Sequence, residues 1–389
     1  MQKKIGPKII LFTFIIVICF SWLFWILLEK YVDTENYENR EMSEQPRLTV
    51  DNYGTFAEEY DNYFNDQLPF RNNLIKLNSW IDYFVFDRSA NSKVIIGKDN
   101  WLFYDNKDDG DPIGCYQGNN LYTEAELQEI AENCVKQRNF LAERNIEFII
   151  FIAPNKERIY SEDMPDRFGT PADNYKVLQI VNYLKEKTDL RVVYPYEELM
   201  SVKEYLDDNI YYKTDTHWKQ ERLLKVAKTI AESMNVNLEN EYKEKTICDF
   251  QGAYSGQLPI STAKDKIKIL TNSEIEKSKV YNYETKKENK VYNMEKINSL
   301  DKYDIYLSGA TPVLKIENPE NKTGNELIIF RDSYASSLVP LFIPKYSKIT
   351  LIDTRYISPK LLSNYVKFNN QDILFMYSTL IINNSYSLK

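Results

Sequence analysis

The chain is poor in the residues from which many active centres are built. Its 389 residues include one histidine, His217. One histidine cannot form a common zinc site, and neither a CxxC nor an HExxH pattern occurs, so we expect no bound metal. No glycine-rich phosphate loop is present, and we therefore expect no nucleotide cofactor. The net charge is −8 and no basic stripe follows the N-terminal lysines, which argues against a nucleic-acid partner.

Cysteine is also scarce. One of the four cysteines, Cys19, lies in an apolar run near the N-terminus, and three follow it: Cys115, Cys134 and Cys248. Three exported cysteines permit one disulfide with one thiol left over, but an odd number identifies no disulfide framework. The pairing of these residues therefore stays open at the level of the sequence.

The N-terminus carries the longest hydrophobic run. Three lysines within residues 1–8 precede residues 9–28, which are twenty uncharged residues and enough to cross a bilayer as a helix. The lysines predict a cytoplasmic N-terminus, with everything after the span outside the cell membrane. A cleaved signal peptide is the alternative, but its apolar core would be unusually long and residues 29–36 offer no small-residue cleavage site. We therefore predict a single-pass signal anchor.

The remainder of the chain divides by composition. Residues 29–50 are polar and suit a tether, and residues 51–389 would form an extracytoplasmic domain. Between about 262 and 300 the domain carries a charged insertion with few apolar residues to bury. A surface β-hairpin is the preferred interpretation of this insertion, and disorder is the alternative.

Helical and extended patterns alternate through the domain. Residues 52–87 predict a helix broken at Pro69. Residues 121–145 predict a second helix that begins with a capping box of Thr123 and Glu126. Apolar runs predict buried strands at 147–154, 191–195, 326–333, 348–355 and 372–378. Continuous apolar strands between helices indicate an α/β/α sandwich with a mainly parallel sheet covered on both faces, here preceded by one transmembrane helix.

The single histidine lies in the stretch TDTHWKQ. Asp215 and His217 are two residues apart, so in an extended segment their side chains point to the same side. An aspartate there can orient an imidazole and stabilise it once protonated, as in a serine triad. The alternative is that Asp215 or Thr216 caps a helix predicted to follow, with His217 an ordinary first-turn residue.

A serine at the end of a predicted strand could complete this pair. The run ELIIFRDS ends at Arg331 and Asp332 and delivers Ser333 just before a helical stretch. Catalytic groups of open α/β sheets gather at the carboxyl ends of the strands, and a helix N-terminus favours a developing oxyanion. The alternative is that Asp332 or Ser333 is a simple N-cap.

These two stretches resemble a known family. TDTHW is similar to the Asp-His-His-Trp motif of the DHHW proteins, and RDSY is similar to their serine block. Both resemble the catalytic domain of alginate O-acetyltransferases, which has an SGNH-hydrolase-like α/β/α fold. The similarity continues in the same order through FNDQLPFRN (64–72), IIGKDNWLFY (95–104), APNKERIY (153–160) and ITLIDTRYI (349–357).

The resemblance implies roles for individual residues. Ser333 would be the nucleophile, His217 the general base and Asp215 the group that orients it. Further candidates for the lining of the site are Lys156, Arg331, Tyr254 and Trp218.

Two departures from the family pattern concern the site. Thr216 replaces the first histidine of the motif, while the retained histidine directly precedes the tryptophan. Arg331 stands where SGNH hydrolases have glycine, and no glycine–asparagine pair can be assigned to an oxyanion hole. The backbone N–H of Ser333 is then the leading oxyanion donor.

The predicted function is a membrane-anchored polysaccharide O-acetyltransferase at the cell membrane, acting through an acyl-serine. The resemblance implies that a membrane-bound O-acyltransferase supplies the acetyl group. One alternative is an acetyl esterase that removes acetyl groups from surface glycans with the same triad. Another is a catalytically inactive glycan-binding protein on the same scaffold, although the presence of all three triad residue types counts against it.

Overall fold

The computed structural model describes most of the chain. The described residues are 8–17, 20, 42–68, 70–86, 89, 91–143, 146, 148–206, 209–256, 258 and 263–384. The chain divides into two compact units, of which the first comprises Met1–Asn91 with Ser255–Ser261 and the second Ser92–Tyr254 with Thr262–Lys389.

The described part of the first unit contains helices and irregular segments. Residues 8–17 are helical, and the helices α2 (Phe56–Asp66) and α3 (Arg71–Phe86) flank position 69, where a break was predicted. Within the described part of the chain, no helix combines the length and the apolar character that a membrane span requires. Residues 18, 19 and 21–28 of the predicted span lie outside the described residues, as do residues 1–7 and 29–41.

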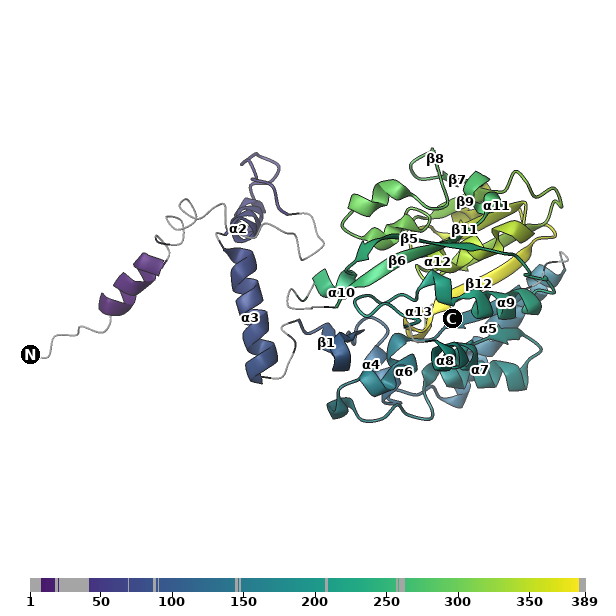
Figure 1. The fold of residues 1–389 in the computed structure, drawn as a ribbon, viewed down its shortest axis with the longest axis horizontal. Helices are drawn as coiled ribbons and strands as arrows, with labels where there is room; N and C mark the ends of the chain where they lie inside the picture. Colours follow the sequence, from purple (N-terminus) through teal and green to yellow (C-terminus); the bar gives the residue numbers. More distant parts are fainter. Residues whose placement is uncertain are drawn as a thin grey trace, which may run out of the picture. The chain divides into compact units, whose positions relative to one another are not determined.

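The second unit is built around one large sheet (Figure 1). Over the described residues this sheet has eight strands in the order β4-β3-β12-β10-β11-β9-β7-β8. The strands are β3 (Phe148–Ala153), β4 (Arg191–Val193), β7 (Lys279–Asn282), β8 (Lys287–Asn289), β9 (Val313–Glu317), β10 (Glu326–Arg331), β11 (Lys348–Ile352) and β12 (Asp372–Ser378). Two antiparallel pairs lie beside it: β1 (Val94–Ile96) with β2 (Leu102–Tyr104), and β5 (Lys243–Phe250) with β6 (Asp265–Thr271).

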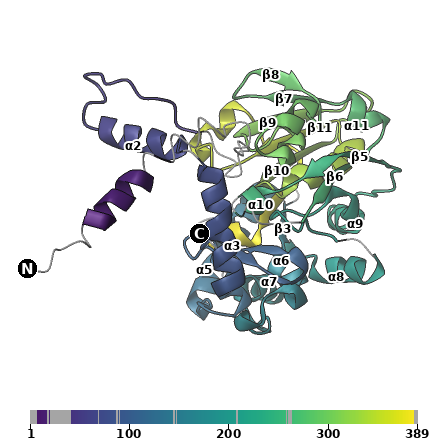
Figure 2. The same cartoon turned by 60° about the vertical axis from the view of Figure 1, so that its left-hand side comes forward.

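The sheet is mixed, so the prediction of a mainly parallel sheet is wrong. β4, β3, β12, β10 and β11 are parallel to one another. β9, β7 and β8 continue the sheet with antiparallel pairing and lie together at one end of it (Figure 2). These three strands all carry lysine, and β8 and β9 also carry glutamate, as antiparallel strands with a solvated face commonly do, so they lack the continuous apolar runs of the parallel strands.

The continuous apolar runs reflect burial on both faces of the sheet. In β10, Leu327 and Ile329 belong to one apolar core, whereas Ile328 and Phe330 belong to the other. The same alternation holds in β3 and β12, because successive side chains of a strand point to opposite faces. The predicted α/β/α layering is therefore confirmed.

Helices cover both faces. The helices after residue 92 are α4 (Pro112–Tyr116), α5 (Glu124–Ala142), α6 (Lys156–Ile159), α7 (Lys176–Lys187), α8 (Tyr196–Tyr205), α9 (Leu224–Ser233), α10 (Ala253–Gly256), α11 (Ser273–Lys277), α12 (Ala335–Leu338) and α13 (Thr379–Asn383). Buried residues of α5, α7 and α13 belong to one core, and those of α8, α9 and α12 belong to the other. The predicted capping box of Thr123 and Glu126 is present at the start of α5.

The charged segment predicted at 262–300 is folded where it is described. It contributes β6, α11, β7 and β8, and β7 pairs with β9 inside the main sheet. Ile267, Ile275 and Val280 are buried in the core. The predicted β-hairpin thus exists as β7 and β8, but it extends the sheet and is not a separate surface excursion.

Candidate active site

Ser333 lies on the turn that follows β10. The carboxylate of Asp332 accepts hydrogen bonds from Ser378 N at 2.7 Å and from Tyr334 N at 3.0 Å, so the turn is tied to the end of the neighbouring strand β12. Ser333 is the one partly exposed residue between positions 331 and 344. The backbone therefore presents this side chain at the carboxyl edge of the parallel strands, where catalytic groups of open α/β sheets gather.

Asp215 and His217 lie at the tip of a narrow loop, which we call the histidine loop (residues 209–221). Its two arms pair through Tyr212 N to His217 O at 3.1 Å and Lys219 N to Ile210 O at 2.6 Å. The helix expected directly after Asp215 begins only at Leu224, so the interpretation of Asp215 or Thr216 as a helix cap is wrong.

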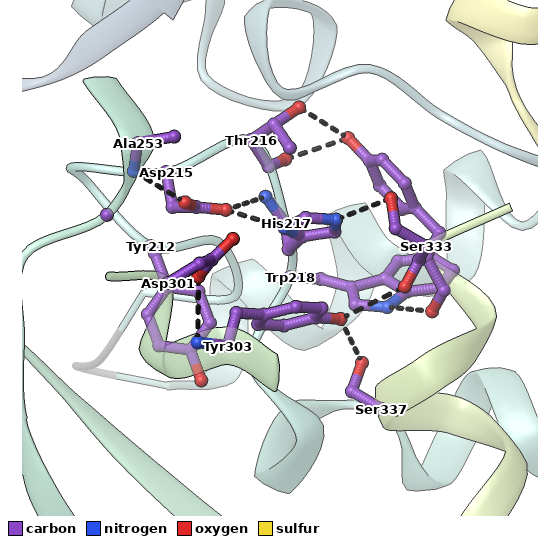
Figure 3. A network of polar contacts seen from close by, with 12 residues as sticks. Tyr212, Asp215, Thr216, His217, Trp218, Ala253, Asp301, Tyr303, Ser333 and Ser337 are labelled. Atoms are coloured by element: carbon purple, nitrogen blue, oxygen red, sulfur yellow. Dashed lines mark hydrogen bonds and ion pairs between the residues drawn. The ribbon is translucent and has the colours of Figure 1, made fainter. Parts of the chain in front are cut away.

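The loop and the turn bring three predicted residues together (Figure 3). His217 Nε2 lies 2.8 Å from Ser333 Oγ, and His217 Nδ1 lies 2.6 Å from Asp215 Oδ1. Asp215 and His217 are buried, and Ser333 is half-buried. A base within hydrogen-bond reach of a hydroxyl, itself oriented by a carboxylate, is the geometry that activates a serine.

The Asp215 carboxylate is held from several directions. Its Oδ1 also accepts a hydrogen bond from His217 N at 3.0 Å, and Oδ2 accepts one from Ala253 N at 2.9 Å. Burial alone would raise the pKa of Asp215, but the imidazole of His217 and these hydrogen bonds outweigh it and hold the pKa below its usual range. Asp215 therefore stays ionised and favours the protonated imidazole beside it.

The approach of residues 252–253 to Asp215 requires a glycine. A Cβ on Gly252 would lie 2.3 Å from Asp215 Cβ and 2.7 Å from Thr214 O. Real Cβ atoms do not approach other heavy atoms so closely. Gly252 was not predicted as a site residue, although it lies two positions before the candidate Tyr254.

Tyr303 is a second site residue that the sequence did not reveal. Its ring stacks on the His217 imidazole with centroids 3.9 Å apart and an interplanar angle of 8° (Figure 3). Its hydroxyl donates to Ser337 Oγ at 2.9 Å, in the helix after the serine turn. Asp301 lies two residues before Tyr303, and its pKa is raised to about 6, first by burial and then by the nearby Asp215 carboxylate. Tyr303 lies in a short helical turn, Lys302–Ile305, between the charged segment and β9, and no strand or helix pattern in the sequence marked it.

Two of the candidate lining residues are buried beside the serine turn. Trp218 is buried and donates from Nε1 to Tyr334 O at 3.1 Å, next to Ser333. Arg331 is fully buried and donates to Ser336 Oγ at 2.8 Å and to Gly309 O at 3.2 Å. Arg331 thus links α12, which follows the serine turn, to residue 309.

Lys156 and Tyr254 lie together on the far side of the histidine loop. The Lys156 ammonium is 4.8 Å from the centre of the Tyr254 ring, and that ring stacks on Tyr104. Lys156 is buried and donates to backbone carbonyls of the loop, so it is not a solvated surface lysine.

Thr216, which replaces a histidine of the family motif, contacts the serine turn. Its carbonyl oxygen accepts a hydrogen bond from the Tyr334 hydroxyl at 2.7 Å, and its own hydroxyl lies 3.3 Å from the same oxygen. The backbone N–H of Ser333 has no acceptor among the described residues. That N–H is therefore available to a developing oxyanion.

The other predicted features lie apart from this site. Cys115, Cys134 and Cys248 are all free thiols, and burial raises the pKa of Cys115 and of Cys134 to about 11. No group of three or more metal-ligating side chains occurs within the described ranges.

Comparison with known sequences places the chain among acetyltransferases. Residues 94–290 match the family described as "SGNH hydrolase-like domain, acetyltransferase AlgX". Over 169 residues the chain is 25% identical to the "Probable alginate O-acetylase AlgJ" of Azotobacter vinelandii, a match that covers 42% of this chain and 39% of that protein. The chain thus spans well under half the length of this curated relative.

Solved structures show the same fold. PatB1 of Bacillus cereus superimposes with a TM-score of 0.54 at 19% identity, covering 74% of this chain and 96% of that chain. A DHHW family protein from Eubacterium siraeum gives a TM-score of 0.49 at 22% identity, covering 74% of this chain and 93% of that chain.

Proposed function

The chain belongs to the family of SGNH hydrolase-like acetyltransferase domains represented by AlgX, and from this premise we propose that it transfers acetyl groups to hydroxyls of a polysaccharide through Ser333. The family resemblance and the SGNH-like α/β fold expected from the sequence are confirmed. The observation that carries the proposal is the hydrogen-bonded series of Asp215, His217 and Ser333 at the carboxyl edge of the sheet.

The first half of the reaction would load the serine. Ser333 Oγ attacks the carbonyl carbon of an acetyl ester while His217 Nε2 takes the hydroxyl proton. Asp215 stabilises the resulting imidazolium through Nδ1. The C–O bond to the donor's leaving oxygen then breaks, and His217 returns the proton to that oxygen. The products are acetyl-Ser333 and the free alcohol of the donor.

The second half would use a sugar hydroxyl as the nucleophile. His217 removes the hydroxyl proton as the sugar oxygen attacks the acetyl carbon, and Ser333 Oγ leaves and recovers its proton from His217. The Ser333 N–H would donate to the oxyanion in both halves. If water took the place of the sugar, the same residues would perform ester hydrolysis.

We place this reaction at the outer face of the cell membrane. The support is the run of twenty uncharged residues at 9–28 after a lysine-rich start, which is long enough for a span. An anchored enzyme would meet a membrane-embedded acetyl donor at high effective concentration, which favours a membrane-bound O-acyltransferase as its partner.

Incubation with an activated acetyl ester tests the proposal. The full-length protein should acquire one acetyl group on Ser333, detected by mass spectrometry of the digested chain, and pass it to an oligosaccharide. A sulfonyl fluoride, which reacts with activated serines, should label the same residue and block acetylation.

The products distinguish the candidate functions. Acetylated oligosaccharide supports the transferase, and free acetate at an unchanged rate with or without acceptor supports the esterase. Absence of both acetyl-Ser333 and sulfonyl-Ser333 would mean that the serine is not activated and would refute the proposal.

A further inference from the structure

The backbone of the histidine loop converges on one buried ammonium group. Lys156 Nζ donates to Asp215 O at 2.6 Å, to Tyr212 O at 3.1 Å and to Lys213 O at 3.3 Å. Lys156 follows the end of β3 and is only 3% exposed. The loop segment that carries Asp215 and His217 is therefore wrapped around a cation from a different part of the chain.

The number of acceptors requires a charged amine. A lysine ammonium has three N–H donors and no acceptor, whereas a neutral amine has two donors and a lone pair. Three carbonyl oxygens around one nitrogen are satisfied only by the ammonium form. Loss of its proton would leave at least one carbonyl facing a lone pair, which is repulsive in a buried site.

Aromatic rings complete the surroundings of the ammonium. Lys156 Nζ lies 5.7 Å from the centre of the Trp101 ring, 5.5 Å from that of Phe103 and 4.8 Å from that of Tyr254. Ring faces attract a cation, so they partly replace the water that burial removes. Carbonyl oxygens and ring faces thus surround the ammonium, and no carboxylate among the described residues forms an ion pair with it.

Resting on the function proposed above, we infer that Lys156 is a positioning residue whose ammonium holds the histidine loop in the conformation that lets Asp215 and His217 serve Ser333. It touches neither the serine nor the imidazole, and it acts through the carbonyls of residues 212, 213 and 215. The Asp215 carbonyl belongs to the same residue that orients the imidazole. A change at Lys156 therefore reaches the hydrogen bond between His217 and Ser333 through the backbone.

Burial and the charged groups around Lys156 together set the pH at which its ammonium loses a proton. Burial lowers the pKa of Lys156 to about 7. The carboxylates of Asp215 in the loop, Asp265 on β6 and Glu157 in the same helix oppose that shift. The Tyr254 phenol, whose pKa burial raises well above its usual value, stays neutral beside it. Deprotonation on the alkaline side should loosen the loop.

The single histidine allows a test that does not depend on catalysis. In the full-length chain labelled with 15N only at histidine, the Nδ1–H signal reports the hydrogen bond from His217 to Asp215. The variant Lys156→Met keeps an apolar stem of similar length among the aromatic rings but donates no hydrogen bond. We expect this variant to shift or broaden the signal and to lower the rate of Ser333 acetylation at least tenfold.

A lysine outside the histidine loop provides the matched control. Lys203 Nζ in α8 donates to Ile159 O and lies 4.5 Å from the centre of the Tyr160 ring. Lys203→Met should retain the wild-type His217 signal and acetylation rate within about twofold. If Lys156→Met behaved like this control, the positioning role would be refuted.

A pH titration of the wild-type chain keeps the inference testable if Lys156→Met does not fold. In the wild-type chain the His217 signal and the acetylation rate should change together on the alkaline side as Lys156 loses its proton. A His217 signal that stays constant over that pH range would show that the Lys156 ammonium does not hold the loop and would overturn the inference. If the wild-type chain shows the signal change but no acetylation, the proposed function fails while the positioning role stands.

Discussion

Ser333 and His217, joined by the hydrogen bond that the serine hydroxyl donates to the imidazole, are held by different kinds of structure. Ser333 follows β10, a strand paired on both sides and buried in two cores, so its position depends on the register of the sheet. His217 lies in a loop whose conformation depends on polar groups of distant segments. The strand that carries the serine is held by main-chain pairing of the kind found in any α/β sheet, whereas the histidine loop needs particular side chains.

Several distant segments anchor the histidine loop. Thr214 N and Oγ1 donate to the Asp265 carboxylate at 2.9 and 2.7 Å, and Lys213 N donates to it at 3.1 Å. Leu102 N donates to Lys213 O at 3.0 Å, and residues 252–253 and Lys156 add the contacts described above. A change in one of these anchors should therefore affect activity more than stability, and a change in β10 should do the reverse.

Removal of the reacting groups should have the largest effect. Ser333→Ala should lower acetyl transfer by about 10³-fold or more with the fold intact, because the nucleophile of a triad has no substitute. His217→Ala should be nearly as damaging. Rates from single-turnover acetylation and circular dichroism of each variant check this prediction, and a Ser333→Ala protein with wild-type turnover would contradict it.

A substitution that crowds the histidine loop should cause the next largest loss of rate. Gly252→Ala places a Cβ 2.3 Å from Asp215 Cβ, so the carboxylate must move. Misplacement of a catalytic group by about 1 Å can cost about 100-fold in rate, and we expect a loss of that order with a smaller change in stability. Gly54→Ala is the control, since a Cβ at Gly54 meets no atom within 4 Å. Equal rates for the two variants would show that the loop tolerates displacement.

A substitution that weakens the sheet should lower stability more than it lowers the rate. Ile329 in β10 is fully buried, and Ile329→Ala should reduce the free energy of unfolding by about 2–5 kcal/mol. The rate per folded molecule should stay within about threefold of wild type, because neighbouring strands keep the register. Denaturant unfolding and active-site titration measure the two quantities. A rate loss as large as that of Gly252→Ala would remove the distinction between the two regions.

A titratable group at the base of the loop should have the smallest effect on rate. Glu221 is buried with Oε2 unpartnered among the described residues, and burial raises its pKa to about 7. The folded state therefore holds the proton more tightly than the unfolded state, so the stability that this group contributes is present below about pH 4.5 and is lost as pH rises through about 7.

Glu221→Gln should remove that dependence. We expect the variant to exceed wild type by about 1–3 kcal/mol in the free energy of unfolding at pH 8 and to match it at pH 4. Acetylation rates should not change. Equal stability of both proteins at pH 8 would mean that the Glu221 carboxylate finds a partner in solution.

The sheet that carries Ser333 and the histidine loop also differ in how well the sequence predicted them. The parallel strands and the turn with Ser333 were predictable because two-sided burial leaves continuous apolar runs and strand ends are marked by polar residues. The antiparallel edge was not, because charged and polar residues interrupt β7 and β9 and make up all of β8, so no continuous apolar run marks these strands. Asp215 and His217 were predicted by their spacing and by family resemblance, and the structure brings both within hydrogen-bond reach along with Ser333.

The supports of the histidine loop could not be predicted from local patterns. Lys156 and Asp265 lie 59 and 51 residues from their partners in the loop. Tyr303 stacks on His217 from just beyond the charged segment predicted at 262–300, in a stretch for which no strand or helix was predicted. Such contacts depend on which backbone atoms the completed fold brings together, and no periodicity of the chain encodes them.

The arrangement of these anchors bears on how the site could be transplanted into another scaffold. A strand, turn and helix at 326–338 would carry Ser333 with its own geometry, since any parallel sheet can receive it. Residues 209–221 transferred alone would keep the sequence of the histidine loop but not its conformation. A chimaera would have to exchange the loop together with β2, the start of α6, residues 252–253 and β6, as one inseparable cassette.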